Sequence, residues 1–227
     1  MRGAILYTGG KDSHYALIEA WLHHNVEPAV LVIVRPRRSD SWMFHSINAI
    51  WATLHADAIG VPYEVVEVSG EKEVEIDELR GHLEEVIARY GCDALVTGAV
   101  ASRYQKERVD KIAKVLGVKH VAPLWLRDQR EIFLLESDLL DFMIVAVQAY
   151  GLSKSVLGVP IRYLGPHRLL QTFSKYGIST VGEGGEFETF VLASPLMKKA
   201  VCVHKARILW SEQAWSGYYV IEDAELC

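Results

Sequence analysis

The stretch "LYTGGKDSHYAL", residues 6–17, joins an apolar run to a helical pattern through a short polar loop. Two adjacent glycines, Lys11, Asp12 and Ser13 make up most of that loop. Glycine accepts positive φ values and lets a backbone approach an anion closely, and a helix that begins at such a loop directs free amide groups outward. The stretch therefore predicts a strand, an anion-binding loop and a helix, in that order.

Short apolar runs alternate with helical periodicity along the first half of the chain. Strands are expected at 3–7, 29–34, 63–68 and 93–98, and helices at 13–25, 46–59, 73–90 and 103–116. Continuous apolar strands between helices indicate a parallel sheet that is buried on both faces, with right-handed crossovers. Ligands of such sheets bind at the carboxyl ends of the strands, where residues 8–13 are expected to lie. The predicted fold class is therefore α/β.

The pattern loosens after about residue 125. Helices are expected at 128–136 and 166–176, and strands at 142–148, 187–193, 200–209 and 217–222. We predict a ligand-binding α/β domain over 1–125 and a smaller mixed α+β subdomain over 126–227, with the functional site in the cleft between them.

Composition excludes several classes of protein. The formal charge of −5 disfavours stable binding of tRNA or DNA, which requires a basic surplus. Cys92, Cys202 and Cys227 lie far apart without a CxxC pair, so they are expected to be free thiols rather than a zinc, iron–sulfur or redox site. No apolar run approaches the roughly 20 residues of a membrane-spanning helix, and the first residues do not resemble a signal peptide, so we expect a cytoplasmic protein.

The spacing around Lys11 excludes two common phosphate motifs. A Walker loop requires Ser or Thr after its lysine, but Asp12 follows here, and a GxGxxG dinucleotide loop is absent. A carboxylate beside bound phosphates is repulsive unless it holds a magnesium ion or a shared water molecule. Asp12 is therefore either a metal ligand or a helix cap.

The hexapeptide from Thr8 to Ser13 resembles the SGGxDS loop of PP-loop ATP pyrophosphatases, which cleave ATP between the α and β phosphates. Only the first position departs, and Thr8 keeps the hydroxyl. The stretches "DSWMFHSIN" (40–48), "TGAVASRYQKERVDKIAKVLGVKHVAPLW" (97–125) and "GEGGEFET" (182–189) match, in order and spacing, the diphthine-ammonia ligase (diphthamide synthetase) family. The resemblance covers essentially the whole chain. It implies an adenine-nucleotide α-hydrolase-like parallel sheet of the HUP, or Rossmann-like, type, with residues 1–125 binding ATP.

The resemblance also implies an activity, a set of partners and the cofactors ATP and Mg²⁺. A ligase of this family activates the carboxylate of diphthine, a modified histidine of translation elongation factor 2, with ATP and amidates it with ammonium. AMP and pyrophosphate leave, and diphthamide is formed through an acyl-adenylate. A homo-oligomer is compatible with the sequence.

Two groups of residues receive roles from the resemblance. The ATP phosphates are expected on Thr8, Gly9, Gly10, Lys11, Asp12 and Ser13, with Asp12 also holding Mg²⁺, and the catalytic residues are Lys11, Asp12, Glu186 and His45. The substrate is expected on Ser102, Tyr104, Gln105, Glu183, Gly184, Gly185, Glu186 and Glu188. The glutamates of the "GEGGEFET" stretch would balance the trimethylammonium group of diphthine. The alternative is an acidic surface loop.

Several alternatives remain at this point. His45 is either the base that accepts a proton from ammonium or a loop residue packed beside Trp42 and Phe44. The stretch "LSKSVLG" at 152–158 departs from the acidic pair and tryptophan of the family, which puts substrate preference in question. Rival functions are another PP-loop amide-forming ligase acting on a small acid, a tRNA-modifying PP-loop enzyme, and a nucleotide sensor without catalysis.

Overall fold

The computed structural model of the chain describes residues 1–37, 48–71 and 73–227. His45, and with it most of the stretch at 40–48, lies outside the described residues, so its predicted role stays a prediction. In the described part, no helix is long and apolar enough to cross a membrane.

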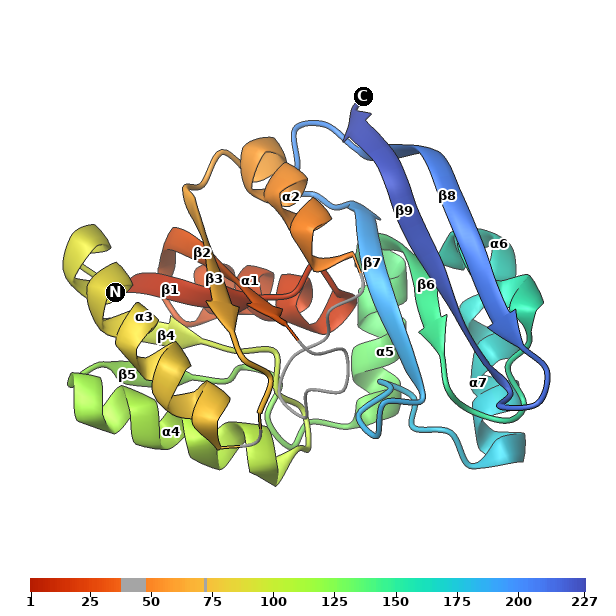
Figure 1. Cartoon of the computed structure of the whole chain (residues 1–227), viewed down its shortest axis with the longest axis horizontal. Coiled ribbons are helices and arrows are strands. Elements are labelled where there is room, and N and C mark those ends of the chain that lie inside the picture. Colours follow the sequence, from red (N-terminus) through yellow and green to blue (C-terminus); the bar gives the residue numbers. More distant parts are fainter. Residues whose placement is uncertain (38–47, 72) are drawn as a thin grey trace.

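A five-stranded parallel sheet forms the first half of the molecule (Figure 1). Its strands are β1 (Arg2–Tyr7), β2 (Glu27–Pro36), β3 (Tyr63–Val68), β4 (Ala94–Val96) and β5 (Lys119–Val121), in the order β3-β2-β1-β4-β5. The first four confirm the predicted strands. Strand β5 was not predicted, because its three residues include only one aliphatic side chain.

Helices cover both faces of this sheet. They are α1 (Lys11–His23), α2 (Ala52–Ile59), α3 (Val74–Tyr90) and α4 (Arg103–Leu116), with a 3-10 turn η1 (Ala49–Trp51) before α2. Alternate residues of β1 point to opposite faces: Ile5 and Tyr7 pack in the cluster of α1 and α2, whereas Ala4 and Leu6 pack with α3 and α4. The predicted α/β fold class is therefore confirmed.

The second half is built on a four-stranded antiparallel sheet, which stands beside the parallel sheet in Figure 1. Its strands are β6 (Asp141–Val147), β7 (Phe187–Ala193), β8 (Val201–Ser211) and β9 (Ser216–Leu226), in the order β7-β6-β9-β8. Its helices are α5 (Gln129–Leu139), α6 (Ile161–Leu164) and α7 (Pro166–Tyr176), with a 3-10 turn η2 (Lys154–Val156). Phe133, Phe142 and Phe173 pack α5 and α7 onto one face with ring centroids 5.5–6.4 Å apart.

The two halves share a continuous apolar core. One cluster of buried side chains runs from Ile5 and Leu17 in the first half to Phe142 and Val191 in the second. Helix α2 packs against both sheets, since Ala52 and Ala56 join this cluster while Leu54 packs against the β7–β9 side. The C-terminal segment is therefore fixed against the parallel sheet, and the cleft between them keeps a defined shape.

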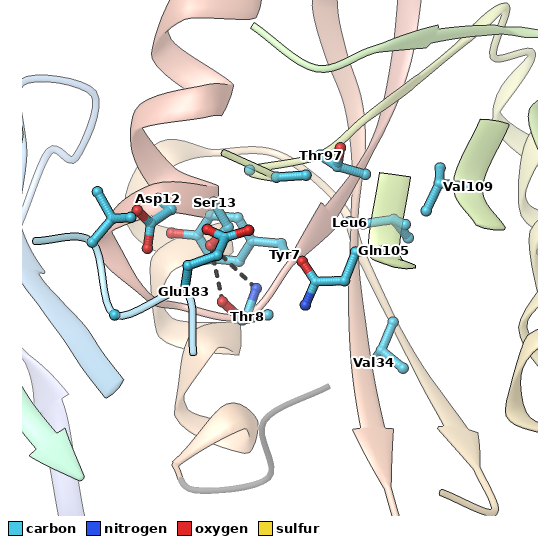
Figure 2. A pocket seen from close by; sticks show the side chains of 14 residues that line it. Leu6, Tyr7, Thr8, Asp12, Ser13, Val34, Thr97, Gln105, Val109 and Glu183 are labelled. Carbon is cyan, nitrogen blue, oxygen red and sulfur yellow. Dashed lines mark hydrogen bonds between the residues drawn. The ribbon is translucent and has the colours of Figure 1, made fainter. Parts of the chain in front are cut away.

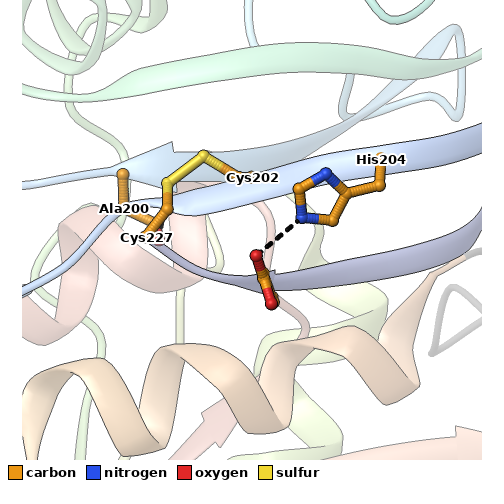
Figure 3. Close-up of a disulfide and its surroundings, with 5 residues drawn as sticks. Ala200, Cys202, His204 and Cys227 are labelled. Atoms are coloured by element: carbon orange, nitrogen blue, oxygen red, sulfur yellow. Dashed lines mark hydrogen bonds and ion pairs between the residues drawn. A yellow bond between two sulfur atoms is a disulfide. The ribbon is translucent and has the colours of Figure 1, made fainter.

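The cysteine prediction was wrong for two of the three residues. Cys202 and Cys227 form a disulfide that joins β8 to the residue after β9 (Figure 3). The two cysteines are 25 residues apart in sequence, but antiparallel pairing of β8 with β9 brings them together. Cys92 is a free buried thiol, as expected.

Candidate active site

A cavity of about 140 Å³ opens at the carboxyl ends of β1, β2 and β4. The strand order reverses direction between β1 and β4, so their loops diverge and leave a crevice, where parallel α/β sheets bind ligands. The cavity is lined by Leu6, Tyr7, Thr8, Asp12, Ser13, Val34, Thr97, Gly98, Ala99, Gln105, Val109, Val181, Gly182 and Glu183. Figure 2 shows Thr8, Asp12, Ser13 and Glu183 gathered at one end, with Leu6, Val34 and Val109 at the other.

Hydroxyl groups hold the loop after β1 in shape. The Ser13 hydroxyl donates to the Gly10 carbonyl at 3.0 Å and lies 3.1 Å from the Thr8 hydroxyl. Gly9 has a φ of +83°, which favours glycine. At Gly98, after β4, an added Cβ would lie 2.7 Å from the backbone of Asp12 and Ser13. Glycine at that position therefore lets β4 approach the start of α1.

Two amides of the predicted anion site are already occupied. The Gly10 amide donates to the Thr8 hydroxyl at 3.3 Å, and the Lys11 amide donates to the Thr189 hydroxyl at 3.1 Å. Within residues 1–37, 48–71 and 73–227, the amides of Asp12 and Ser13 have no such protein partner. These two amides and the partial positive charge of the α1 N-terminus remain for a bound anion.

The Lys11 side chain is directed into the protein. Its ammonium group is fully buried and lies 2.6 Å from an Asp12 oxygen, 3.1 Å from a Glu136 oxygen and 3.2 Å from the Val181 carbonyl. Burial alone would lower the pKa of Lys11, but the carboxylates of Asp12 and Glu136 raise it, so the group stays charged. In this arrangement Lys11 positions the Asp12 side chain and ties the loop to α5 and to Val181, and its predicted contact with phosphate stays a prediction.

Glu136 is a functional candidate that the sequence reasoning missed. It is fully buried on α5. Burial raises the pKa of Glu136 well above its usual value, and the nearby Asp12 carboxylate raises this pKa further. One signal for it was present in the sequence. Ile132, Phe133 and Glu136 lie at helical spacing on one buried face, where an unpaired carboxylate is costly and therefore implies a cationic partner.

Glu183 forms the opposite wall of the cavity. Its carboxylate accepts hydrogen bonds from the amides of Ala101 and Ser102, at 3.0 and 2.5 Å. Burial raises the pKa of Glu183, and the two amide donors oppose that shift. Glu183 thus connects the 182–188 loop to the start of α4 while it lines the cavity.

The remaining glutamates of this loop have different surroundings. Glu186 accepts hydrogen bonds from the amides of Ser179 and Gly184, at 3.2 and 2.8 Å, and so holds its own loop in a turn. Gly185 has a φ of +80° in that turn. Glu188 lines a smaller adjoining cavity of about 60 Å³ together with Asp12. Of the predicted substrate residues, Glu186 therefore holds the turn of the loop, whereas Glu188 lines a cavity.

The three residues predicted from "SRYQ" also divide. Ser102 caps α4, because its side chain accepts from the Gln105 amide at 3.3 Å, and the Gln105 side chain lines the cavity. Tyr104 points away toward α3: its hydroxyl donates to Glu73 at 3.4 Å, and the Arg108 guanidinium lies 3.4 Å from its ring centroid. A helix displays successive side chains about 100° apart, so neighbouring positions cannot all face one cavity.

A buried polar network lies beneath the phosphate loop. The Tyr7 hydroxyl lies 2.5 Å from Nδ1 of His14 and 2.9 Å from Nδ1 of His55, and Nε2 of His55 donates to the Val191 carbonyl at 2.7 Å. Because that carbonyl can only accept, His55 Nδ1 accepts from Tyr7, and Tyr7 in turn accepts from His14. Burial lowers the pKa of His14 to about 3 and that of His55 to about 4, so both rings are neutral. Ser194, 2.7 Å from Nε2 of His14, completes the chain.

These features define a class of protein: a parallel-sheet nucleotide-binding domain whose phosphate loop is closed by a C-terminal subdomain. Sequence comparison narrows the class. Residues 1–120 match the diphthamide synthase N-terminal domain family, and residues 128–227 match the diphthamide synthase C-terminal domain family. The chain therefore belongs to the diphthamide synthase family.

Individual relatives of the chain are named diphthine-ammonia ligase. The diphthine-ammonia ligases of Bos taurus and Homo sapiens are each 30% identical to this chain, with 92% of this chain and 85% of each relative covered. The diphthine-ammonia ligase of Schizosaccharomyces pombe is 30% identical over 86% of this chain but only 35% of its own length. A crystal structure titled as a predicted subunit of tRNA methyltransferase from Methanocaldococcus jannaschii superposes with a TM-score of 0.47 at 13% identity, covering 86% of this chain and 98% of that one.

Proposed function

We propose that this protein is an ATP-dependent ligase that amidates diphthine on translation elongation factor 2 with ammonium, giving diphthamide, AMP and pyrophosphate through an acyl-adenylate. The observation that carries this proposal is the cavity itself, in which Asp12 and Ser13 of the phosphate loop face Glu183 of the C-terminal half. The membership of this chain in the diphthamide synthase family supports the same chemistry.

The two ends of the cavity differ in polarity, which supports one orientation of ATP. Leu6, Val34 and Val109 give the end between β1, β2 and α4 an apolar lining that suits an adenine ring. The phosphates then lie at the other end, near the free amides of Asp12 and Ser13 and the hydroxyl of Thr8, where each hydrogen bond to a charged oxygen contributes roughly 1.5 to 3 kcal/mol. This orientation directs the α-phosphate toward the 182–188 loop, from which the substrate carboxylate approaches.

The residues present fit a magnesium ion that is shared with the nucleotide. No cluster of three or more His, Cys, Asp or Glu side chains suited to a metal occurs in the described ranges. Asp12 supplies a single carboxylate at the phosphate end, and Mg²⁺ is commonly held by one or two carboxylates together with substrate phosphates. Bound there, the ion would neutralise charge on the phosphates, while Lys11 keeps the Asp12 carboxylate in place.

The C-terminal wall provides negative charge for a cationic substrate. Glu183 lines the main cavity and Glu188 the adjoining one, and Gly182 lines both. A trimethylammonium group cannot donate hydrogen bonds, so nearby carboxylates stabilise it through charge alone. Holding that group at the wall places the neighbouring carboxylate toward the nucleotide, which is the main contribution a positioning site can make.

The test is a reaction with elongation factor 2 that carries diphthine. Purified protein, ATP, Mg²⁺ and ammonium are incubated with it, and the modified histidine is analysed by mass spectrometry while AMP is measured in parallel. We expect a mass decrease of about 1 Da, as hydroxyl is replaced by amine, with equimolar AMP and no change without ATP. AMP without the mass change would identify another acid as the substrate. If neither AMP nor the mass change is observed, the protein is a nucleotide sensor without catalysis.

A further inference from the structure

Four aromatic rings adjoin one another near the end of β6 and form what we call the aromatic patch, Tyr150, Tyr176, Trp210 and Trp215. The Tyr150 ring lies 5.6 Å from Tyr176 and 4.9 Å from Trp215, and Trp215 lies 6.1 Å from Trp210. Tyr150 is 68% exposed and Tyr176 is 40% exposed. Single exposed aromatic residues are ordinary, but a contiguous group is a feature of interaction sites.

The patch is held rigidly by three separate segments. Tyr150 follows β6, Tyr176 ends α7, and the two tryptophans belong to β8 and the turn between β8 and β9. The indole nitrogen of Trp215 donates to the Leu152 carbonyl at 2.6 Å, which fixes the turn against the segment after β6. Rings that are already ordered lose little conformational entropy on binding a partner.

The segment that carries Tyr150 is hydrogen-bonded to the 182–188 loop, which forms one wall of the cavity. The Gln148 amide donates to the Glu186 carbonyl at 2.8 Å, and the Gln148 side chain donates to the Tyr218 hydroxyl at 3.1 Å. Tyr150 is thus two residues from a position bonded to the 182–188 loop. The patch therefore lies near the loop past which the side chain of a protein substrate would enter the cavity.

Composition and charge favour a protein as the occupant. Tyr and Trp are the residues most enriched at the centres of protein interfaces, because they combine large apolar area with a polar atom. Nucleic acid would require many cations, whereas the chain has a formal charge of −5. Lys175, whose ammonium lies 5.0 Å from the Tyr176 ring centroid, supplies a charge suited to the rim of a protein interface.

We propose that the aromatic patch is the docking surface for the folded protein whose side chain is amidated in the cavity. This inference rests on the proposed function, because only a macromolecular substrate would extend beyond the 182–188 loop. The patch then contributes to the affinity for the protein substrate and leaves ATP binding unaffected.

The chain offers a closely matched pair of variants. Tyr150→Glu places a charge at the centre of the patch, and Tyr163→Glu changes a tyrosine of similar exposure, 71% against 68%. Tyr163 follows Arg162, which forms an ion pair with Asp141 at the other end of β6. Both side chains are exposed, so both variants are expected to keep the wild-type unfolding temperature.

The measurement is the kinetics of amide formation on diphthine-bearing elongation factor 2, together with calorimetric binding to the same protein. For Tyr150→Glu we expect the KM for the protein substrate and its Kd to rise about tenfold or more, with kcat and the KM for ATP unchanged. Tyr163→Glu should stay within about twofold of wild type, as expected for a position outside an interface.

The outcomes separate the two proposals. Amidation by wild type with equal KM values for both variants would overturn the docking surface and leave the function standing. No amidation, but binding that Tyr150→Glu weakens, would overturn the function and leave the docking surface. If Tyr150→Glu instead abolishes self-association or RNA binding and leaves the KM unchanged, the patch serves another partner and the proposal is wrong.

Discussion

The two walls of the cavity are built in different ways. The phosphate loop is local in sequence, since Thr8, Ser13 and Gly10 hold one another within a few residues. The opposite wall depends on contacts far apart in sequence, such as Glu183 with the amides of Ala101 and Ser102. The comparison shows that the loop after β1 is shaped by local hydrogen bonds, whereas the opposite wall exists only once the C-terminal half has packed against the parallel sheet.

Contacts between residues 7–14 and residues 181–194 join the two walls. They include the Lys11 ammonium with the Val181 carbonyl, the Lys11 amide with Thr189, and the Val191 amide with the Gly9 carbonyl, at 3.2, 3.1 and 2.9 Å. If the walls act as one site, changes at these contacts should affect both stability and nucleotide use. The following predictions test this, beginning with the largest expected effect.

Asp12→Ala tests whether the local wall carries the chemistry of phosphate binding. It removes the one carboxylate of the loop that lines the cavity, and with it the predicted metal ligand. We expect AMP formation to fall by about 10²-fold or more, the scale for loss of a group that stabilises charge at the reacting centre. AMP release is measured by chromatography, with Asp57→Ala, an exposed position of α2, as the control. Full activity of Asp12→Ala would contradict the predicted role of Asp12 in binding phosphate and Mg²⁺.

Glu136→Ala tests the buried ion pair that links the loop after β1 to α5 of the C-terminal half. It leaves the buried Lys11 ammonium with one carboxylate partner instead of two. Breaking a buried ion pair commonly costs about 3–5 kcal/mol of stability, so we expect a marked loss in urea unfolding. The double variant Lys11→Met/Glu136→Leu removes both charges and should recover much of that loss. Additive losses in the double variant would show that the two residues do not interact.

The network under the loop predicts a dependence of stability on pH. Both His14 and His55 have a folded-state pKa far below the ordinary value, to about 3 and about 4. The unfolded chain therefore takes up protons first, and stability falls as pH decreases from about 6.5, by roughly 1.4 kcal/mol per pH unit for each ring. The slope of the free energy of unfolding against pH is measured by urea unfolding from pH of about 6.5 down to about 4. The exposed His24→Gln variant should keep the slope, whereas Tyr7→Phe should alter it, and a flat profile in wild type would contradict the neutral rings.

Features that depend on local sequence were predictable, whereas features that depend on contacts far apart in sequence were not. The parallel strands were predictable because strands buried on both faces are continuously apolar, and β3 was predicted at its observed bounds, 63–68. The loop between β1 and α1 was predictable because its glycines and hydroxyls act locally, and its binding of phosphate stays a prediction. The helical spacing of α5 marks Glu136 as a buried position, but its pairing with Lys11 depends on how α5 packs, which no local pattern encodes. The Cys202–Cys227 disulfide was missed for the same reason, since strand register alone brings the sulfurs together.

Thr189→Val gives the smallest expected effect, and it tests a single hydrogen bond between the two walls. Valine keeps the volume and shape of threonine but cannot accept the hydrogen bond from the Lys11 amide at 3.1 Å. We expect a stability loss of about 1 kcal/mol, the usual net value of one hydrogen bond, and a KM for ATP that rises a few-fold because the loop is held less firmly. Thr172→Val is the matched control, since the Thr172 hydroxyl donates to the Arg168 carbonyl of its own helix, at 3.2 Å.

The combination of readouts distinguishes two roles for the C-terminal wall. If Thr189→Val lowers stability and raises the KM for ATP while Thr172→Val changes neither, the C-terminal wall shapes the phosphate site directly. If stability falls and the KM does not change, the phosphate loop keeps its geometry by local bonds alone, and the two walls are joined in folding but independent in nucleotide binding.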